Sequence, residues 1–469
     1  MSKAWWTYLV TGVAVFMVAM DNLVVTNALP VIRLDLGTGL EGLEWTVNAY
    51  TLTFAVFLLT GAALGDRFGR RRLLAAGLAV FTAASAAAAL STDIGVLVAA
   101  RTVQGLGGAV VMPLTLTLLA SVVPPAKRGL AFGLWGAMSG LGVALGPVIG
   151  GAITEYASWE WIFWINVPVG LMLLPLVALV RDSRGGAGRL DLIGTALVTA
   201  GLFGIVYGLV QGNGHGWTSG PVLAGLAVGG VLLVAFIAWQ ARASAPMMPL
   251  AMFASRGFTL SNVIGLLMSF GMFGTVFLLA QFMQGVQHYS PLEAGVRTLP
   301  WTAMPALAAP VAGILTDRIG AARIVAVGLT LQAAGIGWLA AITSPTLPYS
   351  HMIVPFVLAG LGMGLFFAPI TRLVLGFVPA HLEGVASGTS NAIRQLGTVL
   401  GIAVLGAIFS AQGGYASGQQ FVDGVAPAAT VGAVVLAAGA VVALAIPRPR
   451  TEVAPVAAED RRVPVSAAV

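Results

Sequence analysis

The sequence predicts an all-α integral membrane protein with about fourteen spanning helices. Three observations support this fold class. The 469 residues are 58% hydrophobic and only 9% charged, which is more apolar surface than one soluble core of this length buries. Apolar stretches of about 20 residues, the length that crosses a bilayer, recur along the whole chain. The loops between them are short and leave no room for a sizeable soluble domain.

The apolar stretches define the expected spans in chain order. They lie at residues 7–29, 46–65, 73–91, 96–119, 130–153, 161–180, 191–211, 221–240, 259–283, 292–315, 322–342, 352–372, 384–410 and 426–446. The first stretch follows Lys3, Trp5 and Trp6 and has some features of a signal peptide. Because it is long and carries Asp21 near its middle, we interpret it as an uncleaved first span.

The basic residues predict how these spans are oriented, because cytoplasmic loops retain Lys and Arg. If the N-terminus is inside, the opposite side holds only Arg33 among the basic loop residues. The acidic residues expected on that outer side are Asp35, Glu41, Glu44, Asp93, Glu155, Glu160 and Asp423. The even number of spans then puts both termini in the cytoplasm.

Composition argues against several other classes of protein. The net charge of +6 comes from scattered basic residues, without the basic runs that favour nucleic acid. Cysteine is absent, so neither a disulfide nor a thiolate metal site can form. Among the basic residues only Lys3 and Lys127 are lysines, and with so much Ala, Gly and Val this indicates a GC-rich bacterial genome.

An internal repeat predicts how the spans are grouped. The loop after the second span contains Asp66, Arg67, Phe68 and Gly69, and the loop after the tenth contains Asp317, Arg318, Ile319 and Gly320. Glycines at 129, 133, 142 and 146 recur at 384, 388, 397 and 401. We therefore expect an N-terminal six-helix bundle at 1–183 and an inserted helix pair with linkers at 184–256. A C-terminal six-helix bundle at 257–447 and a disordered cytoplasmic tail at 448–469 follow.

The fifth span carries a regular series of glycines and one proline, namely Gly133, Gly142, Gly146, Pro147, Gly150 and Gly151. Glycines four residues apart share a helix face and let another backbone approach closely. Proline removes a backbone hydrogen bond and kinks the helix. Generic tight packing is the alternative explanation of this series.

Two charged residues in the membrane point to proton coupling. A guanidinium within the bilayer costs at least several kcal/mol unless it is paired, so we expect Arg101 of the fourth span to face the protein interior. Arg101 is the candidate partner of Asp21, with Arg394 as the alternative partner. Burial raises the pKa of a carboxyl, and a nearby cation lowers it. A carboxyl that is subject to both effects can therefore bind and release protons. A fixed structural ion pair is the alternative for Asp21, and a snorkelling side chain for Arg101.

The loop between the second and third spans is the candidate gating loop, with Asp66, Arg67, Gly69, Arg70 and Arg71. We place the aspartate near the N-terminal end of the third span, where the helix dipole favours an anion. The arginines can bind neighbouring helix ends and so stabilise one conformation of the helix bundle over another. The alternative is that these residues only determine topology.

The candidate substrate cavity is lined by Asn27, Gln104, Arg394, Gln395 and Phe273. Arg394 is a second embedded cation without an obvious acidic partner, and it either binds a polar group of the substrate or caps helix carbonyls. One embedded acid against two arginines leaves little attraction for a dication. We therefore expect a neutral or singly cationic amphipathic substrate.

These motifs resemble those of the major facilitator superfamily, and within it the fourteen-helix drug:proton antiporter family. Residues 65–72 resemble the superfamily's loop between the second and third spans, and residues 101–108 are similar to its RxxQGxG pattern. The glycine series of the fifth span matches the spacing of the antiporter motif. Residues 20–30 resemble LDxTVVNVALP, although Leu23, Thr26 and Asn27 depart from it. The resemblance implies the major facilitator fold, with two six-helix bundles and two inserted helices.

The resemblance also implies a function. It implies proton-driven export of antibiotics or other amphipathic toxic compounds by alternating access, with no cofactor beyond the proton gradient. The expected partners are a small amphipathic drug, protons and the lipid bilayer, and the expected state is a monomer in the cytoplasmic membrane of a bacterium.

Other functions remain as alternatives. Export or import of a metabolite or lipid uses the same fold. An ATP-driven pump is disfavoured because neither lysine lies in a GxxxxGK[ST] loop, and an enzyme because the four histidines fall in loops and form no HExxH. We expect no metal site and no catalytic residue.

Overall fold

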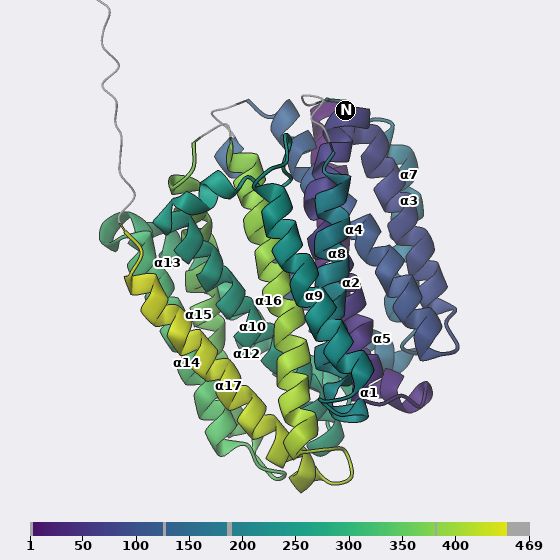
Figure 1. Ribbon diagram of the computed structural model, residues 1–469. Coiled ribbons are helices and arrows are strands. Elements are labelled where there is room, and N and C mark those ends of the chain that lie inside the picture. Colours follow the sequence, from purple (N-terminus) through teal and green to yellow (C-terminus); the bar gives the residue numbers. More distant parts are fainter. Residues whose placement is uncertain (1–2, 125–127, 185–189, 380–381, 448–469) are drawn as a thin grey trace, which may run out of the picture.

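The computed structural model describes residues 3–124, 128–184, 190–379 and 382–447, and these residues form helices joined by loops (Figure 1). The first seven helices are α1 (Lys3–Asp35), α2 (Leu40–Phe68), α3 (Arg70–Ala89), α4 (Ile94–Val122), α5 (Arg128–Tyr156), α6 (Trp161–Trp164) and α7 (Asn166–Val177). The next segments are α8 (Leu192–His215), α9 (Gly220–Gln240) and the short 3₁₀ helix η2 (Leu250–Ala254).

The remaining helices follow from Arg256. They are α10 (Arg256–Gln281), the π-helical turn η3 (Phe282–Val286), α11 (Pro291–Arg297), α12 (Leu299–Thr302), α13 (Met304–Ile319), α14 (Ala321–Ile342), α15 (Tyr349–Gly376), α16 (Glu383–Gln412) and α17 (Gly418–Leu444). The tenth expected span is divided into α11, α12 and α13. Pro300 and Pro305 explain the breaks, because proline lacks the N–H that continues a helix.

In the part of the chain that the structure describes, thirteen helical segments are long and apolar enough to cross a membrane. The chain is therefore a multi-pass membrane protein. The sixth expected span is shorter than the others, because its helices cover only Trp161–Val177. Tight turns extend the segment, with the Val180 N–H donating to the carbonyl of Val177 at 3.0 Å. It packs against α1 and α3 like a full member of the bundle.

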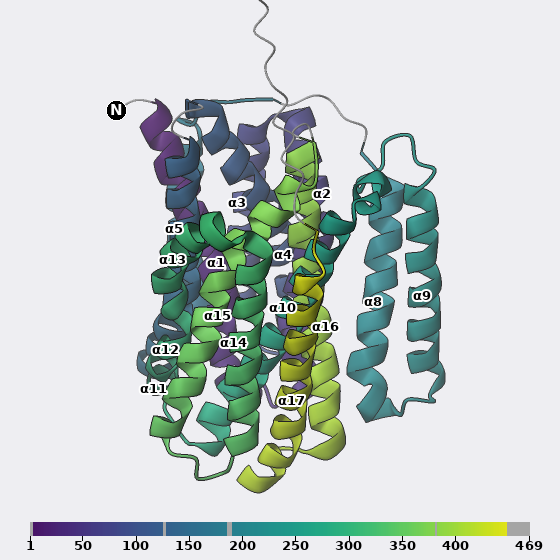
Figure 2. The same ribbon diagram turned by 90° about the vertical axis from the view of Figure 1, so that its left-hand side faces the viewer.

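The helices form two groups and one separate pair. Helices α1 to α7 pack among themselves, and so do α10 to α17. Helices α8 and α9 pack against each other at one edge of the molecule (Figure 2), where α8 contacts α2 from the first group and α16 from the second. The groups meet directly along α2 and α16 and along α5 and α11. The pair α8–α9 therefore stands beside one of these two seams.

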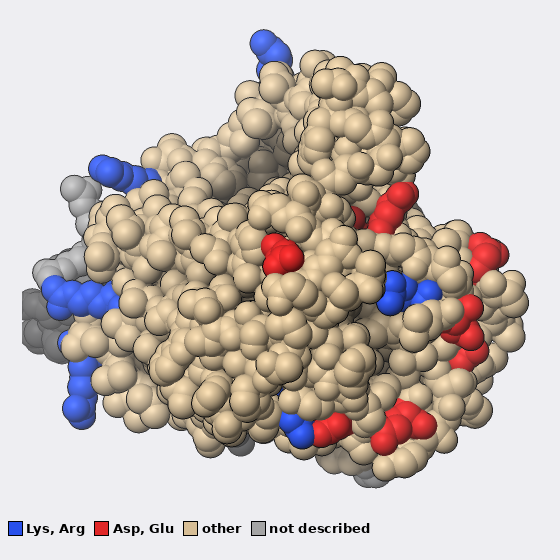
Figure 3. All heavy atoms as spheres, turned by 90° about the horizontal axis from the view of Figure 1, so that it is seen from below, with Lys and Arg blue, Asp and Glu red and all other residues tan. Residues whose placement is uncertain are grey.

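The N-terminus and the end of α17 lie at the same end of the molecule (Figure 1). Acidic side chains gather on the opposite end, which Figure 3 shows from below. The N-terminus and these acidic side chains thus lie at opposite ends of the molecule, as the predicted orientation requires. The orientation in the membrane itself stays a prediction. The predicted tail at 448–469 lies outside the described residues, as do Lys127 and Arg189.

The repeated sequence motifs adopt matching geometry in the two groups. Gly69 joins α2 to α3 with φ +103°, and Gly320 joins α13 to α14 with φ +92°, a region that favours glycine. A Cβ at Gly142 of α5 would lie 2.8 Å from the Phe16 carbonyl oxygen of α1. A Cβ at Gly401 of α16 would lie 2.2 Å from the Phe270 carbonyl oxygen of α10. In both groups, glycines therefore let the fifth helix approach the first.

Candidate functional site

Helices α1 and α4 bring the two predicted proton-coupling residues into contact. Arg101 Nη1 lies 2.5 Å from Asp21 Oδ2, and both side chains are fully buried. Arg101 Nε donates to the carbonyl oxygen of Thr46 at 3.3 Å, and its guanidinium lies 4.2 Å from the centre of the Tyr50 ring. Burial of this kind is tolerated because the charges neutralise each other and α2 supplies further contacts.

Two amide side chains complete the surroundings of the carboxylate. Gln104 Nε2 and Asn166 Nδ2 each donate to Asp21 Oδ1 at 2.8 Å. Gln104 Oε1 accepts from Arg101 Nη1 at 2.7 Å, and Ser85 Oγ lies 2.8 Å from Gln104 Nε2. Both oxygens of the Asp21 carboxylate therefore accept hydrogen bonds from side chains of other helices.

Sequence analysis placed Gln104 in the substrate cavity and missed Ser85 and Asn166. The structure puts all three beside Asp21, on α4, α3 and α7. An asparagine within an apolar span is a signal that could have singled out Asn166, since a polar group in the bilayer needs a partner. Which helices meet around that asparagine could not be known from the chain order.

The glycines after Arg101 explain how α4 holds its position. A Cβ at Gly105 would lie 2.4 Å from the Tyr50 carbonyl oxygen of α2. A Cβ at Gly107 would lie 2.7 Å from the Phe81 backbone nitrogen of α3. Helix α4 is therefore in close backbone contact with two neighbours, and this packing keeps the guanidinium in the middle of the bundle.

Most glycines of the predicted antiporter motif lie between helices. A Cβ at Gly146 would lie 3.0 Å from Leu23 Cβ of α1, and one at Gly150 would lie 2.9 Å from the Val24 carbonyl oxygen. Gly151 faces the other group instead, where its Cβ would lie 2.3 Å from the Pro291 carbonyl oxygen. Gly133 differs from these, because a Cβ there would meet nothing within 4 Å.

Asn27 connects the two groups of helices at the place where α1 crosses α5. Its Nδ2 donates to the carbonyl oxygen of Pro147 on α5 at 2.9 Å and to that of Pro291 on α11 at 3.0 Å. Gln284 Nε2 of η3 donates to the Asn27 carbonyl oxygen at 2.7 Å. Asn27, one of the three residues that depart from the resembled span-one pattern, therefore joins α1, α5 and the second group.

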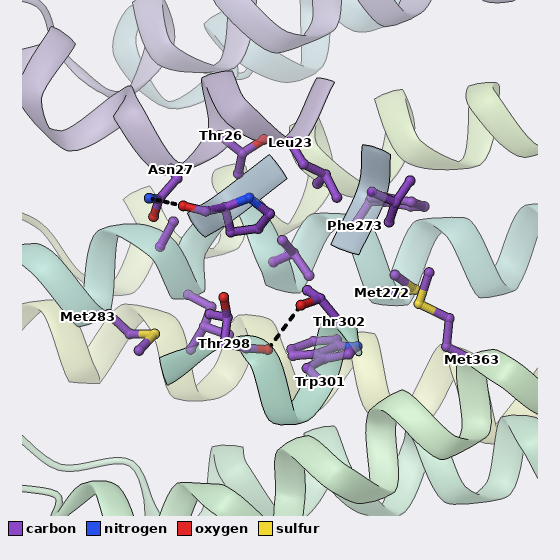
Figure 4. A pocket seen from close by; sticks show the side chains of 15 residues that line it. Leu23, Thr26, Asn27, Met272, Phe273, Met283, Thr298, Trp301, Thr302 and Met363 are labelled. Carbon is purple, nitrogen blue, oxygen red and sulfur yellow. Dashed lines mark hydrogen bonds between the residues drawn. The ribbon is translucent and has the colours of Figure 1, made fainter. Parts of the chain in front are cut away.

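A cavity of about 50 Å³ lies next to this crossing (Figure 4). It is lined by Leu23, Thr26, Asn27, Val143, Pro147, Met272, Phe273, Val276, Leu279, Ala280, Met283, Thr298, Trp301, Thr302 and Met363. None of these side chains is charged. Asn27 and Phe273 are the predicted cavity residues among them, whereas Gln104, Arg394 and Gln395 do not line this cavity.

Arg394 of α16 lies apart from the cavity. Its Nη2 donates to Asn391 Oδ1 at 3.1 Å, and its guanidinium lies 5.4 Å from the centre of the Phe367 ring. The side chain packs against Gly265 of α10, where a Cβ would lie 3.0 Å from Arg394 Cγ. Its role towards the substrate, like that of Gln395, stays a prediction.

The predicted gating loop holds the end of α7. Arg70 Nε lies 2.7 Å from Asp66 Oδ1, and the Arg71 side chain donates to the Ala178 carbonyl oxygen at 3.3 Å. The Arg71 backbone N–H donates to Asp182 Oδ1 at 3.2 Å. Asp66 lies in the last turn of α2, since α3 begins only at Arg70. Arg67 lies against Phe68, 5.5 Å from the centre of its ring.

Glu44 is a buried carboxyl that sequence analysis placed in an outer loop. Helix α2 begins at Leu40, before the expected start of the span at residue 46, so Glu44 lies inside the helix and is 2% exposed. The spacing of Leu40, Leu43, Glu44 and Val47 could have indicated this, because these positions share one helix face. The charge alone suggested a loop.

Known proteins resemble this chain along most of its length. A family model described as Major Facilitator Superfamily matches residues 11–274 and 261–468. The tetracenomycin C resistance and export protein of Streptomyces glaucescens is 36% identical over 88% of this chain and 77% of its own length. The puromycin resistance protein of Streptomyces alboniger is 35% identical over 92% of this chain and 86% of its own.

A solved structure shows the same fold. The crystal structure of a POT family transporter in complex with a thioalcohol-conjugated peptide matches with a TM-score of 0.71 at 14% sequence identity. The match covers 94% of this chain and 96% of the other. Two bundles of spanning helices that meet around a cavity are the architecture of a secondary transporter. The chain belongs to the Major Facilitator Superfamily.

Proposed function

We propose that this protein exports antibiotics or other amphipathic toxic organic compounds in exchange for protons. The observation that carries the proposal is the fully buried Asp21–Arg101 pair, because Asp21 lies on α1, the helix that also contributes Leu23, Thr26 and Asn27 to the cavity lining. Relatives named for antibiotic resistance and export, at 35–36% identity, support the substrate class. An exporter or importer of a metabolite or lipid with the same fold is the alternative.

Helix α1 links the proton site to the cavity. Asp21 and Asn27 are separated by roughly 9 Å along the helix, at 1.5 Å per residue. When Asp21 takes up a proton, it loses its attraction for Arg101, and α1 is free to shift against α4. A shift of α1 moves Asn27 and so changes the contact with α5 and α11. Protonation and cavity shape are coupled in this way.

The cavity indicates the chemistry of the substrate. Its lining combines methionines, aromatic rings and aliphatic side chains with the amide of Asn27, and it presents no charge. Such a surface suits a neutral or singly cationic amphipathic molecule. The volume of about 50 Å³ is far below the roughly 300–1,000 Å³ of drug sites. The two groups must therefore separate before a drug can enter.

The remaining properties follow from the same proposal. The proton gradient supplies the energy, without a bound cofactor. The monomer works in the cytoplasmic membrane of a bacterium, with both termini in the cytoplasm. Arg70 and Arg71 support this orientation, because they lie at the same end of the molecule as the N-terminus and cytoplasmic ends retain basic residues.

Everted membrane vesicles test the proposal. Adding a drug from a panel of antibiotics should dissipate a preset pH gradient, and Asp21→Asn should abolish this response while the protein remains in the membrane. Gly136→Ala is the control, because a Cβ there meets nothing within 4 Å. If Asp21→Asn exchanges protons normally, the coupling role is wrong. If metabolites or lipids dissipate the gradient and drugs do not, the alternative function is correct.

A further inference from the structure

Glu44 lies in the seam between the two groups of helices. It belongs to α2, which packs against α16 of the other group, and only 2% of its surface is exposed. It lies one turn after α2 begins at Leu40, at the end of the molecule opposite the N-terminus. Helix α2 also reaches the Asp21–Arg101 pair through Thr46 and Tyr50, but the proposed mechanism does not use Glu44.

Gly406 of α16 makes room for this carboxyl. A Cβ added at Gly406 would lie 1.6 Å from Glu44 Oε1, so any larger residue there would displace the carboxyl. The carboxyl is therefore inserted against the backbone of α16. This position exists only while α2 and α16 are packed together, and separating the two helices would expose Glu44 to water.

The surroundings of Glu44 offer no counter-charge. Oε1 has no hydrogen-bond partner, and no ion pair in the described part of the chain includes this residue. On its own helix, one turn earlier, Glu41 carries the same charge and accepts from Gln211 of α8. Asn213 of α8, which is uncharged, donates to the Ala407 carbonyl oxygen beside Gly406.

A basic side chain from α1 is engaged elsewhere. Arg33, at the end of α1, lies with its guanidinium 4.0 Å from the centre of the Tyr415 ring. The Tyr415 hydroxyl donates to Gln281 Oε1. Burial raises the pKa of Tyr415, Arg33 opposes this, and Glu44 raises it further. The phenol next to Glu44 therefore stays neutral across the physiological range.

An ionised carboxylate without a partner is costly to bury, whereas a protonated carboxyl is not. The packed seam therefore favours the protonated form of Glu44, and the separated seam favours the ionised form. By linkage, closing the seam takes up a proton, and acidity stabilises the closed state. The same reasoning does not apply to Asp21, which keeps Arg101 as a partner.

We propose that Glu44 is a second proton-binding site, occupied when α2 and α16 are packed and emptied when this seam opens. The inference rests on the proposed function for its place in the transport cycle. In the predicted orientation, Glu44 exchanges its proton with the outer medium, so an acidic exterior closes the outer end. The proton at Glu44 then controls access, while the one at Asp21 is coupled to the drug.

Distance measurement between spin labels tests this directly. The chain has no cysteine, so Leu90→Cys and Ala416→Cys place one label on each group at the end where Glu44 lies. Leu90 is 68% exposed, and Ala416 is exposed too. The labelled protein also carries Asp21→Asn, which removes the other proposed proton-binding site. Double electron–electron resonance in lipid nanodiscs then follows the closed and open populations from pH 5 to pH 8.

We expect the ratio of closed to open protein to rise on acidification, by up to about tenfold per pH unit for one proton. Glu44→Gln should hold this ratio nearly constant, whereas Glu44→Asp should retain the dependence. Glu41→Gln is the matched control, since it removes the neighbouring carboxyl and should leave the dependence intact.

Three results would overturn the inference: no pH dependence before Glu44 is changed, a full dependence in Glu44→Gln, or its loss in Glu41→Gln. If Glu44→Gln does not fold, Glu44→Ala replaces it as the variant without a carboxyl and should likewise hold the ratio nearly constant. The measurement needs neither drug nor gradient. Its failure therefore leaves the vesicle assay unaffected, and a failed vesicle assay leaves the pH response of the seam intact.

Discussion

At the scale of single residues, the ion pair of Asp21 and Arg101 organises the first group of helices. The carboxylate accepts three hydrogen bonds, from Arg101, Gln104 and Asn166. Arg101 Nη2 has no hydrogen-bond partner among the described residues. A buried pair of this kind stabilises little by itself, but removing one partner leaves the other charge uncompensated. The pair is thus suited to a change of protonation that shifts the structure.

We predict that Arg101→Gln destabilises the protein by about 3–5 kcal/mol, because it leaves the Asp21 carboxylate buried without a cation. The double variant Asp21→Asn/Arg101→Gln should recover a large part of this loss, since both groups are then neutral. Thermal unfolding in detergent at pH 7 measures both. If Arg101→Gln alone were as stable as the wild type, the stability of the protein would not depend on pairing Asp21 with Arg101.

At the scale of elements, glycines and prolines decide which helices approach and where they break. Gly142, Gly146 and Gly150 bring α5 against α1, while Gly151 faces α11 in the other group. The predicted antiporter motif is therefore a contact surface towards both groups at once. The pair α8–α9 is attached by an apolar cluster in which Val206 of α8 packs with Val56 of α2 and Val399 of α16. Asp191 caps α8 and also holds the segment after α9.

Asp191 provides a pH-dependent prediction for this pair. Burial alone would raise its pKa, but hydrogen bonds from Trp239, the Gly194 N–H, Gln240 and the Met247 N–H lower it below the ordinary value. A lowered pKa means that the stabilisation is present above the unfolded value of about 3.9 and is lost as the pH falls through the folded one.

Replacing Asp191 by Ala should therefore cost roughly 1 kcal/mol at pH 7, as for other N-caps. Thermal unfolding at pH 7 and near pH 3.5 measures the difference between variant and wild type, which should shrink at the lower pH. A difference that is unchanged or grows on acidification would contradict the hydrogen-bond explanation.

At the scale of the whole molecule, transport requires the two groups to move against each other. At the end opposite the N-terminus they are joined by Glu155 of α5, which accepts from the Ser290 hydroxyl and from the Leu292 N–H at 3.0 Å. The seam of α2 and α16 closes the other side, with α8 bridging it. The cavity lies between these contacts, and its small volume of about 50 Å³ agrees with a molecule that is closed at this end.

We predict that joining the two groups at this end stops transport. In Glu155→Cys/Ser290→Cys, a short reducible thiol cross-linker should abolish drug-dependent proton exchange, and reductant should restore it, because the cavity then cannot open. Each single cysteine variant, treated in the same way, is the control. Normal exchange by the cross-linked protein would mean that the groups need not separate here.

The sequence by itself determined the fold class, the approximate spans and the two charged residues of the buried pair. Long apolar stretches can only satisfy their backbone groups as helices in a bilayer, and an embedded charge requires an opposite one. These are local constraints. Even the internal repeat could be found from spacing, because each half repeats the same loop and the same glycine-rich crossing.

Only the tertiary structure decided which polar residues meet. Ser85 and Asn166 join Asp21 from helices that are distant in the chain, and Gln104 belongs to that network rather than to the cavity lining. The spacing within α2 could indicate that Glu44 faces inward, but only the folded chain shows that Gly406 of α16 lies opposite it. Contacts between helices depend on packing across the bundle, and that packing is a property of the folded chain as a whole.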